Sequence, residues 1–211
     1  MLEIHLFVNP LGSRCFRCER DVLKIDHQLN TKINYRFIPF FNMATIQQTI
    51  EFYHLDPRSL AVRQNVSNTI YRVILDYMAA SFQGKKRGRQ FLLMLQNALI
   101  KEDSNYNDSL VKDIASQSKL DLEMFLEDRH SNLAKKAFHQ DQQFAKSLEV
   151  TKPATAVVFD SKQLQYGFLL NNFDYETLIT AYKNKQLEND LSIATFVKNY
   201  QSHPLTKTMQ K

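Results

Sequence analysis

The sequence predicts an α/β protein in which a long helical block separates two shorter segments built from strands and helices. Three observations support this fold class. Short apolar runs next to prolines lie near both ends of the chain, apolar residues recur at spacings of three and four between them, and no internal repeat is present. The chain has 211 residues, of which 44% are hydrophobic. This length is at the upper end for one domain and the lower end for two, and it suffices to bury a sizeable core.

The first segment is predicted to form a strand, a helix and a second strand. Leu2–Val8 is short and apolar and is followed by Asn9-Pro10, which is typical of a buried strand. After a loop, the apolar positions suit a helix over about residues 15–29. A second strand follows at residues 33–38, and Pro39 closes it.

The middle of the chain is predicted to be a bundle of helices. Val66, Ile70 and Val73 illustrate the pattern, because their spacing places them on one face of a helix. Five helices are expected: one ending near Gly84, one over residues 91–99, one capped by Asn107 or Ser109, a short one capped by Asp121, and one from Ser131 to about Leu148. We interpret their apolar stripes as the core of the bundle.

The chain returns to strands near its C-terminal end. Residues 154–159 predict a strand directly after Pro153, and residues 165–170 predict its antiparallel partner across a turn at Asp160-Ser161. A helix over residues 175–185, a short helix within residues 191–200 and a loose tail over residues 201–211 complete the prediction.

These elements predict a domain organisation. We expect a split α/β domain of residues 1–40 and 150–190, an inserted helical domain of residues 41–149, and a short C-terminal helix and tail at residues 191–211.

The charge distribution argues against a nucleic-acid or membrane partner. The net charge is only +5, from 27 Lys and Arg against 22 Asp and Glu, and charges of both signs are interspersed along the chain. The densest basic run, Lys85-Lys86-Arg87 with Arg89, is interpreted as a solvated turn or helix start rather than a phosphate site. No signal peptide and no apolar run of about 18 residues is present, so we expect a soluble, cytoplasmic protein.

Two cysteines, Cys15 and Cys18, are the residues most suited to chemistry. They are three positions apart at a predicted strand-to-helix turn, where the helix N-terminus stabilises a thiolate. This arrangement suits attack on a disulfide by Cys15 and resolution of the mixed disulfide by Cys18. Arg14 and Arg17 would add positive charge that favours the thiolate.

The cysteines allow two other interpretations. They could be buried thiols without a redox role, or half of a zinc site. A zinc site needs four ligands, and the six histidines show no paired ligand spacing, so we expect neither a metal nor another cofactor. No hydrolase or nucleotide-binding motif is visible either.

Pro153 is a candidate cis-proline. A proline that begins a buried strand costs no hydrogen bond of the sheet there, but only about 5–6% of X–Pro bonds in folded proteins are cis. The isomer of the Lys152–Pro153 bond is therefore left open.

The order of strand, cysteine-pair helix, strand, proline, hairpin and helix resembles the thioredoxin fold with an inserted helical domain, as in its DsbA-like branch. Three stretches carry a further resemblance: residues 83–92 (QGKKRGRQFL), 120–131 (LDLEMFLEDRHS) and 150–159 (VTKPATAVVF). They resemble the SpxH (YjbH) group of Gram-positive bacteria, cytosolic adaptors that deliver the regulator Spx to the ClpXP protease.

The resemblance implies roles for individual residues. Cys15 corresponds to the nucleophilic cysteine, Cys18 to the resolving cysteine, and Pro153 to the cis-proline facing them. Lys152 would place a cation near the sulfurs.

Two function classes remain open. The protein is either a thiol–disulfide oxidoreductase or isomerase, or an adaptor whose thioredoxin fold is a scaffold and whose cysteine pair is a redox sensor or vestigial. The second is slightly favoured, because the more specific motifs lie in the helical block. The expected partner is accordingly a Spx-like regulator with ClpXP, or a thiol or disulfide substrate. The sequence gives no indication of the oligomeric state.

Overall fold

The structure is a computed structural model that describes residues 2–28, 33–160, 166–171 and 209–210. It contains two compact units, each formed by segments that are far apart in the sequence. The sheet unit draws on Met1–Val8, Arg17–Ile38 and Leu148–Lys211, and the helical unit on Asn9–Phe16 and Pro39–Ser147. The predicted α/β composition, with helices between two groups of strands, is confirmed.

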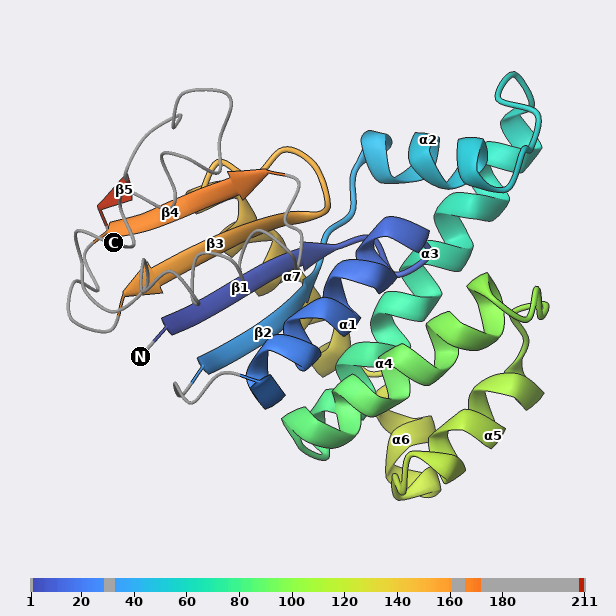
Figure 1. The fold of residues 1–211 in the computed structure, drawn as a ribbon. Helices are drawn as coiled ribbons and strands as arrows, with labels where there is room; N and C mark the ends of the chain where they lie inside the picture. Colours follow the sequence, from blue (N-terminus) through green and yellow to red (C-terminus); the bar gives the residue numbers. More distant parts are fainter. Residues whose placement is uncertain (1, 29–32, 161–165, 172–208, 211) are drawn as a thin grey trace. The chain divides into compact units, whose positions relative to one another are not determined.

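The sheet unit is built around one sheet of five strands in the order β2-β1-β3-β4-β5 (Figure 1). The strands are β1 (Leu2–Val8), β2 (Ile33–Pro39), β3 (Thr155–Asp160), β4 (Tyr166–Asn171) and β5 (Met209–Gln210). The first four match the predicted strands to within one or two residues. The two-residue β5 pairs with β4 in a region where the sequence predicted no strand.

The register of the sheet is antiparallel on both sides of β3. Leu6 of β1 lies opposite Ala156, and Val157 lies opposite Leu169 of β4. The hairpin predicted from the two C-terminal apolar runs is therefore confirmed.

The apolar pattern of each strand agrees with its place in the sheet. Residues 4–8 of β1 are all buried, as are residues 155–159 of β3, because both strands are internal. The strand β2 lies at an edge and exposes Asn34 and Arg36 while it buries Ile33 and Phe37.

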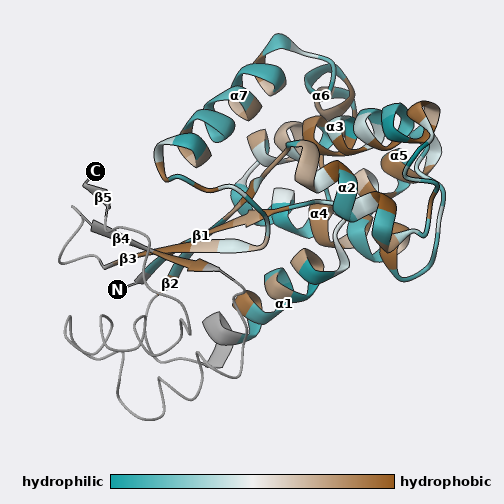
Figure 2. Cartoon of the chain, turned by 90° about the horizontal axis from the view of Figure 1, so that it is seen from above, coloured by the Kyte–Doolittle hydropathy of each residue, from teal (hydrophilic) through white to brown (hydrophobic). Residues whose placement is uncertain are grey.

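Helix α1 (Ser13–Gln28) covers one face of the sheet (Figures 1 and 2). It begins two residues before the predicted start at Cys15 and ends one residue before the predicted end. Cys18 and Val22 are buried, whereas Arg17 and Arg20 are exposed. Figure 2 shows this division as separate brown and teal bands along the helices.

The helical unit contains six helices in its described part: α2 (Met43–Phe52), α3 (Leu60–Phe82), α4 (Lys85–Ile100), α5 (Asp108–Gln117), α6 (Leu122–Asp128) and α7 (Asn132–Ser147). Five of them were predicted, and α2 was not. Helix α2 is short, and it begins with a capping box in which the Asn42 side chain accepts from the Thr45 N–H and Thr45 Oγ1 accepts from the Asn42 N–H.

The predicted helix starts are confirmed by side-chain caps. Asn107, rather than Ser109, caps α5 by accepting a hydrogen bond from the Leu110 N–H at 2.9 Å. Asp121 caps α6 and Ser131 caps α7 in the same way, each through the N–H three residues later.

Helix α3 is the centre of the helical unit, because α2, α4, α6 and α7 all pack against it. Two glycines allow α4 to follow α3 closely, one in the turn between them and one within α4. Gly84 has a positive φ of 119°, and Gly88 packs so closely on α3 that an added Cβ would lie 2.8 Å from Ser81 Cα.

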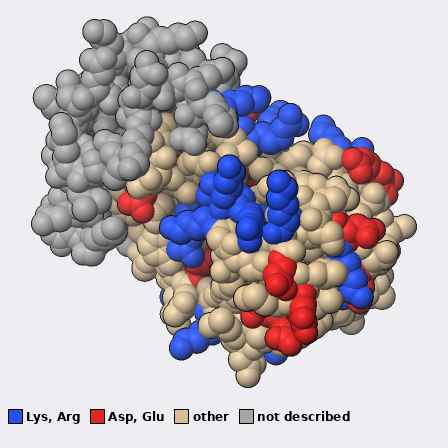
Figure 3. Space-filling model, turned by 90° about the horizontal axis from the view of Figure 1, so that it is seen from below, with Lys and Arg blue, Asp and Glu red and all other residues tan. Residues whose placement is uncertain are grey.

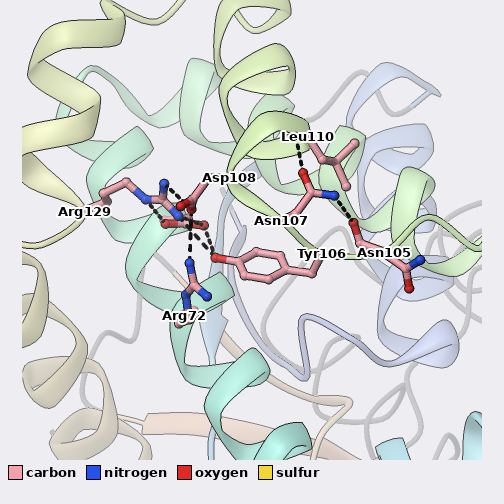
Figure 4. Close-up of polar contacts among 8 residues, drawn as sticks. Arg72, Asn105, Tyr106, Asn107, Asp108, Leu110 and Arg129 are labelled. Carbon is pink, nitrogen blue, oxygen red and sulfur yellow. Dashed lines mark hydrogen bonds and ion pairs between the residues drawn. The ribbon is translucent and has the colours of Figure 1, made fainter.

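A buried ion pair joins α3 to the end of α6 (Figure 4). Arg129 donates to both carboxylate oxygens of Asp76, at 2.7 and 3.2 Å, and Arg129 is 3% and Asp76 1% exposed. The Tyr106 hydroxyl donates to Asp76 Oδ2 at 2.7 Å. Asp108, at the surface, accepts from both Arg129 and Arg72 at 3.1 Å.

The ionisation of these groups follows from their surroundings. Burial raises the pKa of Asp76, while Arg129 and Tyr106 act in the opposite direction. Burial and the adjacent Asp76 raise the pKa of Tyr106 well above its usual range. The hydrogen bond from Arg129 and its charge lower the pKa of Asp108.

Several predictions lie outside the described residues. They are Ser161 of the hairpin turn, the helix over residues 175–185, the short helix within residues 191–200 and most of the tail. None of the helices in the described part of the chain has the length and apolar character that crossing a bilayer requires.

Candidate functional site

A turn leads directly from β1 into the cysteine-bearing helix. The residues Asn9-Pro10-Leu11-Gly12 place Asn, Pro and Gly at positions where β-turns favour them. The Gly12 N–H donates to the Asn9 carbonyl at 3.0 Å, and the Leu11 N–H donates to Asn9 Oδ1 at 3.0 Å. Gly12 also approaches Asn9 closely, since a Cβ there would lie 3.2 Å from Asn9 Cβ.

The side chain of Asn9 ties this turn to α2. Its amide Nδ2 donates to Thr49 Oγ1 at 2.9 Å and to the Thr45 carbonyl at 3.3 Å. Asn9, Thr45 and Thr49 are all buried, so these bonds are shielded from water. The turn is therefore held by the helical unit, to which residues 9–16 belong.

Cys15 lies in the first turn of α1, which is 16 residues long. Its Sγ accepts a hydrogen bond from the Asn9 backbone N–H at 3.2 Å. The first turn of α1 contains no acidic residue, so the positive end of the helix dipole is not neutralised there. A hydrogen-bond donor and a helix N-terminus both stabilise a thiolate over a thiol.

Cys18 lies one turn further along the same helix. Cys15 and Cys18 are both thiols, not a disulfide, and they are 3% and 4% exposed. Arg14 and Arg17, which were expected to favour the thiolate, are exposed. No contact between either arginine and a sulfur is present among the described residues, so their tuning role stays a prediction.

Pro153 and Lys152 directly precede β3 in the sheet unit. Pro153 is buried and Lys152 is exposed. The isomer of the Lys152–Pro153 bond was an open question, and the cis peptide bond recorded in the described part of the chain joins Pro153 to Ala154 instead. The role of Pro153 beside the cysteines, which the resemblance implies, stays a prediction.

Two functional candidates were missed in the sequence. Asn9 was interpreted only as a strand terminator, although the Asn-Pro-x-Gly pattern could have predicted the turn. Glu19, on α1 one turn after Cys15, is fully buried, which no pattern in the sequence indicated.

The basic run at the start of α4 is a helix start, as predicted, since Lys85–Ile100 is helical from its first residue. On the face drawn in Figure 3, blue Lys and Arg side chains gather near the centre of the view with red Asp and Glu side chains close to them. Among the described residues, no group of His, Cys, Asp or Glu side chains could hold a metal ion.

Comparison with known proteins identifies relatives over most of the chain. A family model described as thioredoxin matches residues 5–181. The ClpXP adapter protein SpxH of Bacillus cereus is 26% identical over 208 residues, which cover 86% of this chain and 68% of that protein. SpxH of Bacillus subtilis is 28% identical over 182 residues, which cover 79% of this chain and 61% of that protein. The chain therefore spans about two thirds of the length of these relatives.

Solved structures share the fold at low sequence identity. The cytosolic disulfide reductase DsbM of Pseudomonas aeruginosa superposes with a TM-score of 0.61 at 14% identity, covering 88% of this chain and 98% of that one. At this identity the likeness concerns the fold alone.

Proposed function

The chain belongs to the thioredoxin family, and within that family we propose that it is a cytoplasmic adaptor that binds a Spx-like regulator and presents it to the ClpXP protease. The predicted thioredoxin fold with a DsbA-like helical block is confirmed, and in this proposal it serves as a binding scaffold. The pair Cys15 and Cys18 is then a redox sensor or a vestige of the fold.

The observation that carries the proposal is the likeness to SpxH adapter proteins over 86% of the chain. The fold alone would not distinguish an adaptor from an enzyme, because the same scaffold supports both. The burial of the thiols agrees with a scaffold, since cysteines that turn over disulfides lie in partially exposed surroundings.

Binding to purified Spx tests the proposal. Isothermal titration of wild-type chain and of the double variant Cys15→Ser with Cys18→Ser is expected to give a complex in both cases, with affinities that agree within about twofold. Absence of a complex at about 50 μM of each protein would refute the proposal.

Thiol–disulfide exchange is the second candidate function, and the contact between the Asn9 N–H and Cys15 Sγ favours it. The Cys15 thiolate would attack a substrate disulfide, forming a mixed disulfide and releasing one substrate thiolate. The Cys18 thiolate would then attack Cys15 Sγ, which releases the reduced substrate and leaves the Cys15–Cys18 disulfide. Four residues would support this reaction in the proposal. The positive charges of Arg14, Arg17 and Lys152 would favour the thiolate, and Pro153 would face the cysteine pair.

Reduction of insulin by the dithiol form tests this second function. Wild type should act faster than an equal concentration of a small dithiol, Cys15→Ser should be inactive, and Cys18→Ser should accumulate the mixed disulfide. A wild-type rate equal to that of the small dithiol would refute thiol–disulfide exchange as a function, and the adaptor function would then be the remaining proposal.

A further inference from the structure

The helical unit contains a cavity of about 280 Å³ that neither proposed function uses. The cavity is lined by the Asn9–Gly12 turn at Leu11, by the end of α2, by one face of α3, by the end of α4 and by the segment after α4. The lining residues are Leu11, Thr49, Tyr53, Leu55, Asn65, Val66, Thr69, Leu99, Asp103, Ser104, Asn105 and Tyr106. Every one of them belongs to the helical unit.

The lining combines an apolar floor with a single charge. Leu11, Val66 and Leu99 are buried and supply apolar surface. Asp103 is the only charged side chain among the twelve lining residues, all of which are described, so no cation neutralises it within the lining. Asp103 acts on the lining of the cavity. Burial raises the pKa of Tyr53, and the negative charge of Asp103 raises it further.

The exposed Asp103 lies in a segment that backbone hydrogen bonds anchor to the end of α4. Backbone hydrogen bonds from Glu102 and Ser104 to the carbonyls of Asn97 and Ala98, at 3.2 and 2.9 Å, fix the chain on both sides of Asp103. The Tyr106 hydroxyl is fixed by its bond to Asp76 in the buried network (Figure 4). A binding segment that is already ordered loses less conformational entropy when a ligand binds, which favours affinity.

These features define the chemistry of an occupant. An apolar stem would contact the leucines and Val66, and a cation at its tip would face Asp103 with the Tyr53 and Tyr106 rings beside it. The volume is slightly below the roughly 300–1,000 Å³ of pockets for drug-sized ligands, which favours one side chain over a cofactor. Lysine and arginine are the side chains that combine a long stem with a charged tip.

We propose that this cavity binds a lysine or arginine side chain of a protein partner. The proposal rests on the proposed function in one respect, namely that the partner is a protein. It adds that the bound segment is basic at the point of contact and that its stem is buried against apolar side chains.

A titration with short peptides tests the inference on the full chain. The probe is an acetylated and amidated Ala-Leu-Arg-Leu-Ala peptide, compared with the same peptide carrying neutral citrulline in place of arginine. Amide resonances of Thr69 and Asn105 are expected to shift saturably, with binding about tenfold tighter for arginine than for citrulline. Equal binding of the two peptides, or no saturable shift, would overturn the inference.

Two variants locate the binding. Asp103→Asn should weaken the arginine peptide about tenfold and leave the citrulline peptide unchanged. Asn65→Phe, at an exposed position of the lining, should fill the cavity and abolish both. The matched control Asp113→Asn removes an exposed carboxylate of α5 outside the lining and should change neither affinity.

Two further arms separate the possible outcomes. If n-hexylamine saturates the cavity and the arginine peptide does not, the site binds small amines and the inference is wrong. If the peptide binds as expected but Spx does not, the cavity inference stands and the adaptor proposal fails.

Discussion

At the scale of single residues, Asn9 connects Cys15 to helix α2. Its N–H donates to Cys15 Sγ, its carbonyl and Oδ1 accept from the turn, and its Nδ2 donates to Thr49 and Thr45. All four polar groups of this fully buried residue are used. A change at Asn9 is therefore expected to affect both stability and the thiol.

Asn9→Asp tests this double role. A carboxylate cannot donate to Thr49 and Thr45, so we expect the free energy of unfolding to fall by about 1–3 kcal/mol. Its negative charge beside Cys15 should disfavour the thiolate and slow alkylation of Cys15 by iodoacetamide at pH 7 about tenfold. Asn68→Asp, at an exposed position of α3, is the control and should change neither quantity. An unchanged alkylation rate in Asn9→Asp would show that Asn9 does not affect the ionisation of the Cys15 thiol.

Arg129 is expected to be the most sensitive position of the buried network. Arg129→Met leaves the Asp76 carboxylate buried without its bidentate partner, which should cost about 3–5 kcal/mol of the free energy of unfolding. Urea unfolding measures this loss, with the exposed Arg58→Met as control. A loss as small as that of the control would show that the ion pair is not coupled to the fold.

The pH dependence of stability should report on Asp108. Because its folded pKa lies below its unfolded value, Asp108 stabilises the fold above the unfolded pKa, and this contribution disappears as the pH falls through the folded pKa. Asp108→Asn should therefore lower the free energy of unfolding slightly at pH 7, and this difference should disappear as the pH falls through the folded pKa. The effect should stay under about 1 kcal/mol, because the side chain is largely exposed. Urea unfolding from pH 7 down into the acid range checks it, and a difference that does not shrink as the pH falls would contradict the assignment.

At the scale of elements, the contact between α3 and α4 depends on the missing side chain of Gly88. Gly88→Ala would gain helix propensity, but its Cβ would lie 2.8 Å from Ser81 Cα, and backbone cannot rotate away. We expect a net loss of about 1–3 kcal/mol in urea unfolding. Gln90→Ala, on an exposed position of the same helix, should change stability by less than about 0.5 kcal/mol. A stabilised Gly88→Ala protein would contradict the close packing.

The sequence predicted elements well where one local pattern decides them. Helix caps at Asn107, Asp121 and Ser131 predicted three helices, and the apolar run Ala156–Phe159 predicted most of β3. Helix α2 was missed although it is as long as α5, which was predicted. Its start depends on a capping box of Asn42 and Thr45, which differs from the usual signature of Ser or Thr followed three residues later by Glu or Gln.

At the scale of the whole molecule, the sequence predicted the order of the segments but not all of their contacts. Residues 9–16 were assigned to the strand-containing segment because of their place in the chain, whereas the structure groups them with the helical unit. The bonds from Asn9 to Thr45 and Thr49 span 36 and 40 positions, a separation at which a single sequence carries no pairing signal. The cavity was missed for the same reason, since five separate segments line it.

Degradation of Spx by purified ClpXP is the most direct test of the central claim that this chain is an adaptor. Adding the wild-type chain is expected to accelerate the loss of Spx several-fold, and the double variant Cys15→Ser with Cys18→Ser should do so equally. A degradation rate that is unchanged by the wild-type chain would contradict the claim.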